Sequence, residues 1–184
     1  RLYKTLLNIY SGQFNFYCFT DNSKDIVPGV IIRDIAELRK HPTNCFTIEK
    51  MFLFDNVIEG NNVILDLDIL VQKDLYPYLS QYGFCEGRFI QNEWNDVYQS
   101  AIAVRYGTCC LNSSFVTWKD DQMKYVLDFF LKHQKIIEFK YGDLDTFLYQ
   151  AMRDDLHYHP QKIVMSYNYA DENVNLKDYP ILIF

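Results

Sequence analysis

The hydrophobic positions along this chain switch repeatedly between a helical period of about 3.6 residues and the pattern of a buried strand. Turn signals rich in Gly, Asn, Asp and Pro separate these segments. The pattern predicts helices over 1–10, 48–57, 120–132 and 143–153. It predicts strands over 14–20, 30–33, 63–65, 111–118, 163–166 and 181–184, with short strands near 84, 89 and 101–105. This alternation predicts an α/β fold of one domain, with a mostly parallel central sheet flanked by helices.

The segment 63–71, VILDLDILV, carries the clearest chemical signal. An apolar strand runs directly into Asp66 and Asp68, and in an extended chain their carboxylates point to one side while Leu65 and Leu67 point to the other. Two carboxylates leaving a buried strand repel each other and lose solvation, and a divalent cation relieves both costs. Ligands of parallel α/β sheets bind at the carboxyl ends of strands. The pair therefore predicts a Mn²⁺ or Mg²⁺ site, against the alternative of ordinary strand-end residues that cap a turn.

A cation in this position predicts group transfer from a substrate that carries a diphosphate, because the ion takes up charge as the bond to the diphosphate breaks. Phosphoryl transfer would use the same chemistry. The sequence has neither a Gly-rich loop of the GxxxxGK[ST] type nor the His-Arg-Asp set of protein kinases, which counts against that alternative.

Composition and charge narrow the class of protein further. The formal net charge of −6 argues against nonspecific binding to nucleic acid. No apolar run approaches the roughly 18 residues of a transmembrane helix. The five cysteines lack the spacing of a zinc site and favour reduced thiols in a cytoplasmic protein, with peripheral attachment to a membrane left open.

Several segments in order resemble glycosyltransferases of the GT-A fold that are related to glycosyltransferase family 8, a group of bacterial and viral nucleotide-sugar transferases. They are FNFYCFTD at 14–21, KMFLF at 50–54, VILDLDILV at 63–71, LNSSFVTWK at 111–119 and YGDLDTFLY at 141–149. Each motif is modest alone, but the ordered set spans nearly the whole chain. The resemblance implies the GT-A fold for a single catalytic domain over 1–184. The family's first strand is expected before Arg1, and its extreme C-terminus, with a third metal ligand, beyond Phe184.

The resemblance also implies roles for individual residues. By this resemblance, Asp66 and Asp68 match the metal-binding pair, and Lys50 matches a basic residue that reaches the donor. Thr20 and Asp21 match positions nearest the nucleotide, and Asn112 and Ser113 match positions that face the donor sugar. Asp143 and Asp145 match an acidic motif with a catalytic or orienting role. Taken alone, the same residues allow simpler interpretations: a solvated helix lysine for Lys50, a turn residue for Asn112 and a helix cap for Asp143. Relatives tend to carry Gln where this chain has Leu144, which leaves the retaining or inverting course open.

Together these observations predict a metal-dependent glycosyltransferase that moves a hexose or deoxyhexose from a nucleoside diphosphate donor, with UDP favoured, to a hydroxyl of a glycan or other acceptor. A sugar nucleotidyltransferase and a non-catalytic carbohydrate-binding domain of the same fold are the alternatives. Loops over 81–109, with Trp94, Tyr98 and Arg105, are expected to shape the acceptor side, and His157 and His159 are expected at the surface. The sequence leaves the sugar, the acceptor, the linkage and the oligomeric state open.

Overall fold

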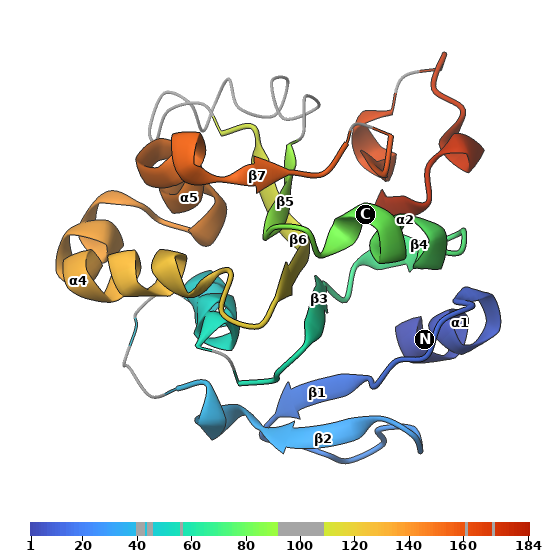
Figure 1. Cartoon of the computed structure of the whole chain (residues 1–184), viewed down its shortest axis with the longest axis horizontal. Helices are drawn as coiled ribbons and strands as arrows, with labels where there is room; N and C mark the ends of the chain where they lie inside the picture. The colour runs from blue at the N-terminus through green and yellow to red at the C-terminus, as the bar shows by residue number, and fades with distance from the viewer. Residues whose placement is uncertain (40–42, 44–45, 56, 92–108, 161, 171) are drawn as a thin grey trace.

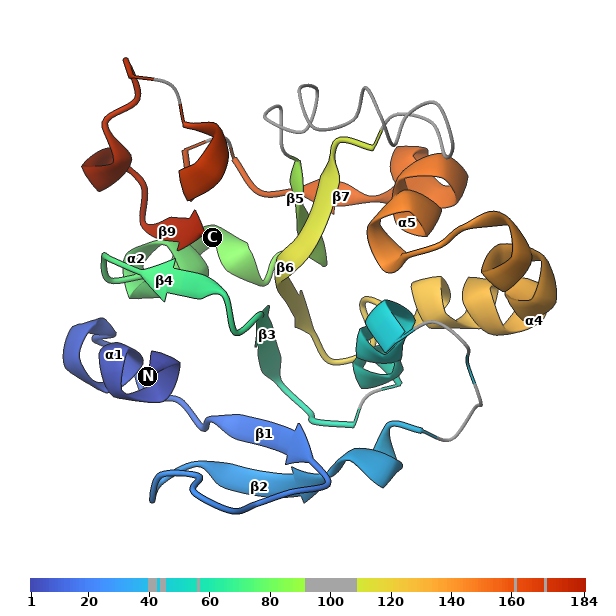
Figure 2. The ribbon, with the colours of Figure 1, turned by 180° about the vertical axis from the view of Figure 1, so that it is seen from behind.

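The computed structural model describes residues 1–39, 43, 46–55, 57–91, 109–160, 162–170 and 172–184. In this part of the chain the strands form three sheets (Figures 1 and 2). The central sheet has the order β3 (Asn61–Leu65), β6 (Leu111–Lys119), β5 (Arg88–Gln91) and β7 (His157–Tyr158). The second has the order β4 (Ile69–Val71), β9 (Ile181–Ile183) and β8 (Val164–Ser166), and the third pairs β1 (Tyr17–Thr20) with β2 (Ile31–Asp34). The predicted strand near Arg105 and the residues Trp94 and Tyr98 lie outside the described residues.

Strand direction in these sheets is mixed. β6 runs antiparallel to both of its neighbours, β3 and β5, and β4 runs antiparallel to β9. The pairs β1–β2, β5–β7 and β8–β9 are parallel. The α/β class is confirmed, but the prediction of a mostly parallel sheet is not. The hydrophobic period identifies which segments become strands, whereas direction depends on where each connection crosses the sheet.

The larger core lies between the central sheet and three helices, α4 (Lys124–Lys140), α5 (Leu144–Met152) and the 3₁₀ helix η2 (Phe46–Phe54). The predicted apolar stripe of α4 is confirmed, since Val126, Leu127 and Phe130 are almost fully buried. The helix begins later than predicted and continues to Lys140, with non-helical backbone at His133.

The segment predicted as an α-helix over 48–57 is a 3₁₀ helix that ends at Phe54. Its three most buried side chains explain the difference. Ile48, Met51 and Phe54 are spaced by three residues and are at most 1% exposed. Side chains three residues apart eclipse one another along a 3₁₀ helix, so this winding places all three in the core. Lys50 lies between them on a different side of the helix.

The smaller core packs α1 (Leu2–Ile9), α2 (Tyr76–Tyr78) and the short π-helix η3 (Leu79–Gly83) with the sheet of β4, β9 and β8. Leu2 and Leu6 of α1 are buried in it, as the helical spacing of 1–10 predicts. None of the described helices is long and apolar enough to cross a membrane.

The prediction of a loop at 157–159 is wrong, because His157 and Tyr158 form β7. The predicted surface position is also wrong for His159, which is only 5% exposed. β7 pairs with β5 in parallel, and the backbone N–H of His159 continues this pairing by donating to Phe89 O at 2.8 Å. The imidazole stacks on Phe115, with ring centroids 4.4 Å apart, and its Nδ1 lies 2.7 Å from Tyr78 Oη. Burial lowers the pKa of His159 to about 3, so the ring is neutral. His157, by contrast, is exposed as predicted.

Candidate functional site

Asp66 and Asp68 lie on a turn that leaves the carboxyl end of β3. The backbone N–H of Asp66 donates to Ser114 O at 3.0 Å, and the N–H of Ile69 donates back to Asp66 O at 3.3 Å. Leu67 at the tip is 95% exposed. The strand end is therefore where the sequence predicts it, but the extended Asp-Leu-Asp geometry is wrong. The chain turns here because β3 belongs to the central sheet, while β4 pairs with β9 in another sheet.

The ammonium group of Lys50 joins η2 to this turn. Lys50 Nζ lies 2.9 Å from Asp66 Oδ2 and 3.1 Å from Asp66 Oδ1, and it also donates to Ser113 O at 3.3 Å. Both ionic side chains keep part of their surface in solvent, 25% for Lys50 and 31% for Asp66. The ion pair is thus accessible to an incoming ligand, and an anion or a cation can compete for either partner.

Asp145 of α5 contacts the same residue of β6 as Lys50 does. Its Oδ1 accepts the backbone N–H of Ser113 at 3.1 Å, so Asp145 and Lys50 bind the N–H and the carbonyl of the same residue. Asp145 keeps some contact with solvent, but its carboxyl is deeply surrounded by protein. This desolvation raises the pKa of Asp145 to about 6, against the lowering effects of the Ser113 hydrogen bond and the Lys50 charge.

Asp143 acts as the N-cap of α5. Its Oδ1 accepts the backbone N–H of Thr146 at 2.7 Å, and its Oδ2 accepts the Thr146 hydroxyl at 2.9 Å. Both carboxylate oxygens therefore fix the first turn of α5, the turn that carries Asp145. The interpretation of Asp143 as a helix cap is confirmed.

The remaining predicted site residues make local contacts. Asn112 Oδ1 accepts the backbone N–H of Ser114 at 2.9 Å. The Thr20 hydroxyl accepts the N–H of Asn22 at 3.0 Å, and Asp21 is exposed just beyond β1. Within the described residues, no hydrogen bond or ion pair joins Thr20 or Asp21 to the group formed by Lys50, Asp66, Ser113 and Asp145, named here the Lys50 cluster.

Two contacts that sequence reasoning missed hold this cluster together. The Thr47 hydroxyl accepts the backbone N–H of Leu144 at 3.1 Å and so ties η2 to the start of α5. Ser114, through its carbonyl, fixes the position of Asp66. Ser114 directly follows the predicted site residue Ser113, and Thr47 stands three residues before Lys50. Neither contact has a sequence signal, because each depends on a partner far along the chain.

The donor atoms at this site suit a hard divalent cation. Asp66 and Asp68 offer carboxylate oxygens, and the Asp68 side chain is exposed. In the described part of the chain, no group of three or more His, Cys, Asp or Glu side chains is arranged to hold a metal ion. Two carboxylates completed by substrate phosphates and water are a common arrangement for Mg²⁺, so the residues present fit such an ion.

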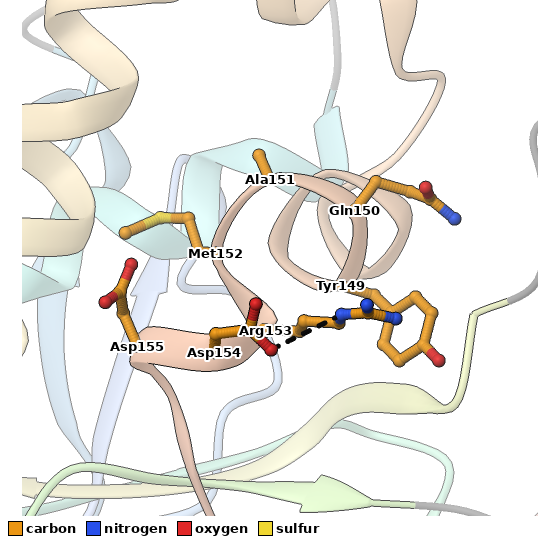
Figure 3. Close-up of a pocket in the computed structure, with 7 residues that line it drawn as sticks. All are labelled: Tyr149, Gln150, Ala151, Met152, Arg153, Asp154 and Asp155. Atoms are coloured by element: carbon orange, nitrogen blue, oxygen red, sulfur yellow. Dashed lines mark ion pairs between the residues drawn. The ribbon is translucent and has the colours of Figure 1, made fainter.

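A separate cavity of about 270 Å³ lies at the other end of α5, lined by residues 149–155 (Figure 3). Arg153 Nε lies 3.5 Å from Asp154 Oδ1, and the Arg153 guanidinium lies 5.8 Å from the centre of the Tyr149 ring. No residue of the Lys50 cluster lines this cavity, so it is distinct from the candidate site.

No protein-family model and no curated protein matches this chain. Among solved structures, it is similar to the galactosyltransferase LgtC in complex with donor and acceptor sugar analogues, with a TM-score of 0.64 and 10% identity over 99% of this chain and 80% of that one. An active-site mutant of LgtC gives a TM-score of 0.56 at 10% identity, with the same two coverages. The apo form of the glycosyltransferase GlyE from Streptococcus pneumoniae TIGR4 gives 0.54 at 16% identity, over 84% of this chain and 40% of that one. These likenesses establish the fold, and the predicted glycosyltransferase fold is confirmed.

Proposed function

We propose that this chain is a metal-dependent glycosyltransferase that moves a sugar from a nucleoside diphosphate donor, UDP-sugar in the first instance, to a hydroxyl group of a glycan or another acceptor. The fold supports this proposal, since it is that of LgtC, whose structure contains donor and acceptor sugar analogues. Fold alone does not select a reaction, so the proposal rests on the chemistry of the Lys50 cluster.

The observation that carries the proposal is the convergence of one ammonium group and two carboxylates from separate elements. Lys50 comes from η2, Asp66 follows β3 and Asp145 lies on α5. Lys50 and Asp145 both contact the backbone of Ser113 in β6. This arrangement supports the proposal, because the ammonium group could bind phosphate oxygens while the carboxylates could accept sugar hydroxyls. A nucleoside diphosphate sugar needs both kinds of group next to each other.

The chain's own residues divide this work by their surroundings. Lys50 is a compact positive charge on a flexible stem, suited to leave Asp66 and bind a diphosphate oxygen. Asp145 can accept a sugar hydroxyl, and a pKa of about 6 allows it to hold or release a proton near neutral pH. Asp143 positions Asp145 by capping α5. Asn112 and Ser113 lie at the start of β6, where their polar groups border the donor sugar in this proposal, and Thr20 and Asp21 border the nucleotide.

Asp66 and Asp68 would hold a Mn²⁺ or Mg²⁺ ion together with the donor. When bound, such an ion stabilises the negative charge that develops on the departing diphosphate. If Asp66 held such an ion, Lys50 would lose its full partner and could bind the diphosphate.

A donor-turnover assay tests this function directly. We expect the purified chain to release free sugar and UDP from a UDP-sugar in the presence of Mn²⁺, and to lose this activity with EDTA or in Asp66→Asn. Asp154→Asn is the control, because it removes a carboxylate that lies outside the Lys50 cluster on a side chain that is 92% exposed. This variant should keep the activity. Formation of a UDP-sugar and pyrophosphate from UTP and a sugar 1-phosphate would instead identify a sugar nucleotidyltransferase. A complete lack of turnover over a panel of nucleotide sugars would favour a non-catalytic carbohydrate-binding domain.

A further inference from the structure

The last turns of α4 present large apolar side chains to solvent. Phe139 is 94% exposed and Ile136 is 65% exposed, while their neighbour Ile137 is only 2% exposed and anchors the helix in the core. An exposed phenylalanine on a well-packed helix gains nothing for folding. Single exposed apolar residues are common, but two on adjacent turns of one helix face, with basic residues beside them, mark an interaction surface.

The charge around these two side chains is opposite to that of the whole chain. Lys135 and Lys140 are exposed beside them, and Lys132 is exposed just before the non-helical backbone at His133. The α4 face comprises these three lysines with Ile136 and Phe139. Residues 132–140 contain three lysines and one glutamate, a local excess of two positive charges on a chain with a formal net charge of −6. In the described part of the chain, neither Lys132 nor Lys135 forms an ion pair, and Lys140 Nζ lies 4.9 Å from the centre of the Tyr141 ring.

The position of the α4 face leaves it accessible. In both views α4 lies on the opposite side of the molecule from the two ends of the chain (Figures 1 and 2).

We infer that the α4 face docks on an anionic lipid surface. Basic residues that surround exposed Phe and Ile side chains on one side of a helix are the pattern of helices that lie in the membrane interface. The lysines are attracted to acidic headgroups, and the apolar side chains enter the acyl boundary.

A nucleic acid would use the lysines but leave Phe139 in water. Two apolar side chains are also too few for a second copy of the chain, because stable protein interfaces bury on the order of 1,200 Å² or more. This inference is independent of the proposed catalytic function.

Vesicle sedimentation of the whole chain tests this inference. We expect binding to phosphatidylcholine vesicles that contain about 30% phosphatidylserine, little binding to phosphatidylcholine alone, and weaker binding at high salt. Phe139→Ala should lower the partition coefficient on the order of tenfold. Each of Lys132→Ala and Lys135→Ala should lower it about fivefold. Because these side chains are exposed, urea unfolding of each variant should match that of the parent protein.

Matched variants on α1 provide the control. Leu7 is 55% exposed and Lys4 is exposed, and both lie on a helix away from α4, so Leu7→Ala and Lys4→Ala should leave vesicle binding unchanged. Equal binding to neutral vesicles, no binding, or anionic binding that survives Phe139→Ala would each overturn the inference. A concentration-dependent dimer in sedimentation velocity that Phe139→Ala dissociates would overturn it too, in favour of a second copy of the chain as the occupant.

Discussion

The buried carboxyl of Asp145 should leave a measurable signature in the pH dependence of stability. Its pKa rises from an ordinary value of 3.8 to about 6 in the folded protein, chiefly through desolvation. The folded state therefore holds this proton more tightly than the unfolded chain does. Stability from this group is greatest below about pH 4, falls as the pH rises through about 6, and is constant above that. The shift corresponds to about 3 kcal/mol, and because Asp145 keeps some solvent contact we expect about 2 kcal/mol.

Asp145→Asn isolates this contribution. The amide oxygen can still accept the Ser113 N–H, but the side chain no longer has a charge to desolvate. Urea unfolding followed by fluorescence of the buried Trp118 should give equal free energies of unfolding for the two proteins near pH 3, below the pKa of the unfolded carboxyl. At pH 7.5 the variant should be more stable by about 2 kcal/mol. Asp143→Asn is the matched control, since Asn is also a good N-cap and the Asp145 carboxyl remains. Parallel pH profiles for the parent protein and Asp145→Asn, or a less stable variant at pH 7.5, would refute the reasoning.

Three further changes test the site and its support. Lys50→Met removes the ammonium group that competes with Mn²⁺ for Asp66. The affinity for Mn²⁺ without nucleotide should therefore rise about threefold, while the affinity for UDP should fall. Calorimetric titration measures both affinities, and unchanged values would mean that Lys50 has a purely structural role. Asp143→Ala should cost about 1 kcal/mol in urea unfolding through loss of the α5 cap, and an unchanged midpoint would contradict that role. Gly87→Ala should lower the free energy of unfolding by about 1–3 kcal/mol, because the new Cβ would lie 2.8 Å from Cγ of Met123, which is only 1% exposed. An unchanged free energy of unfolding would mean that Met123 can repack.

The elements that could be predicted from the sequence are those with a strong local signal. The apolar stripe of α4, the helical spacing of α1 and the polar break at the end of β3 each depend on residues close together in the chain, and each appears in the structure. The cap at Asp143 is likewise a local contact, made with a backbone group three residues away.

What could not be predicted depends on distant partners. The turn at Leu67 exists because β4 pairs with β9, more than a hundred residues further along the chain. His159 is buried because β7 pairs with β5 and Phe115 covers the ring. The Lys50–Asp66 ion pair could not be predicted, since no local pattern reports that η2 packs beside the end of β3 and the resemblance implies only that Lys50 reaches the donor. The apolar strand predicts the position of the Asp-Leu-Asp segment correctly. The prediction that this segment is extended is wrong, because the chain turns after β3.

Calorimetric titration of UDP in the presence and absence of Mn²⁺, with the parent protein and with Asp68→Ala, tests the central claim most directly. Asp68 has an exposed side chain, so its loss should leave the fold and its circular dichroism unchanged. We predict that the parent protein binds UDP far more tightly with Mn²⁺ than without it, and that Asp68→Ala loses this difference. The same Mn²⁺-dependent affinity in both proteins would contradict the claim that the turn after β3 holds a cation for a nucleoside diphosphate.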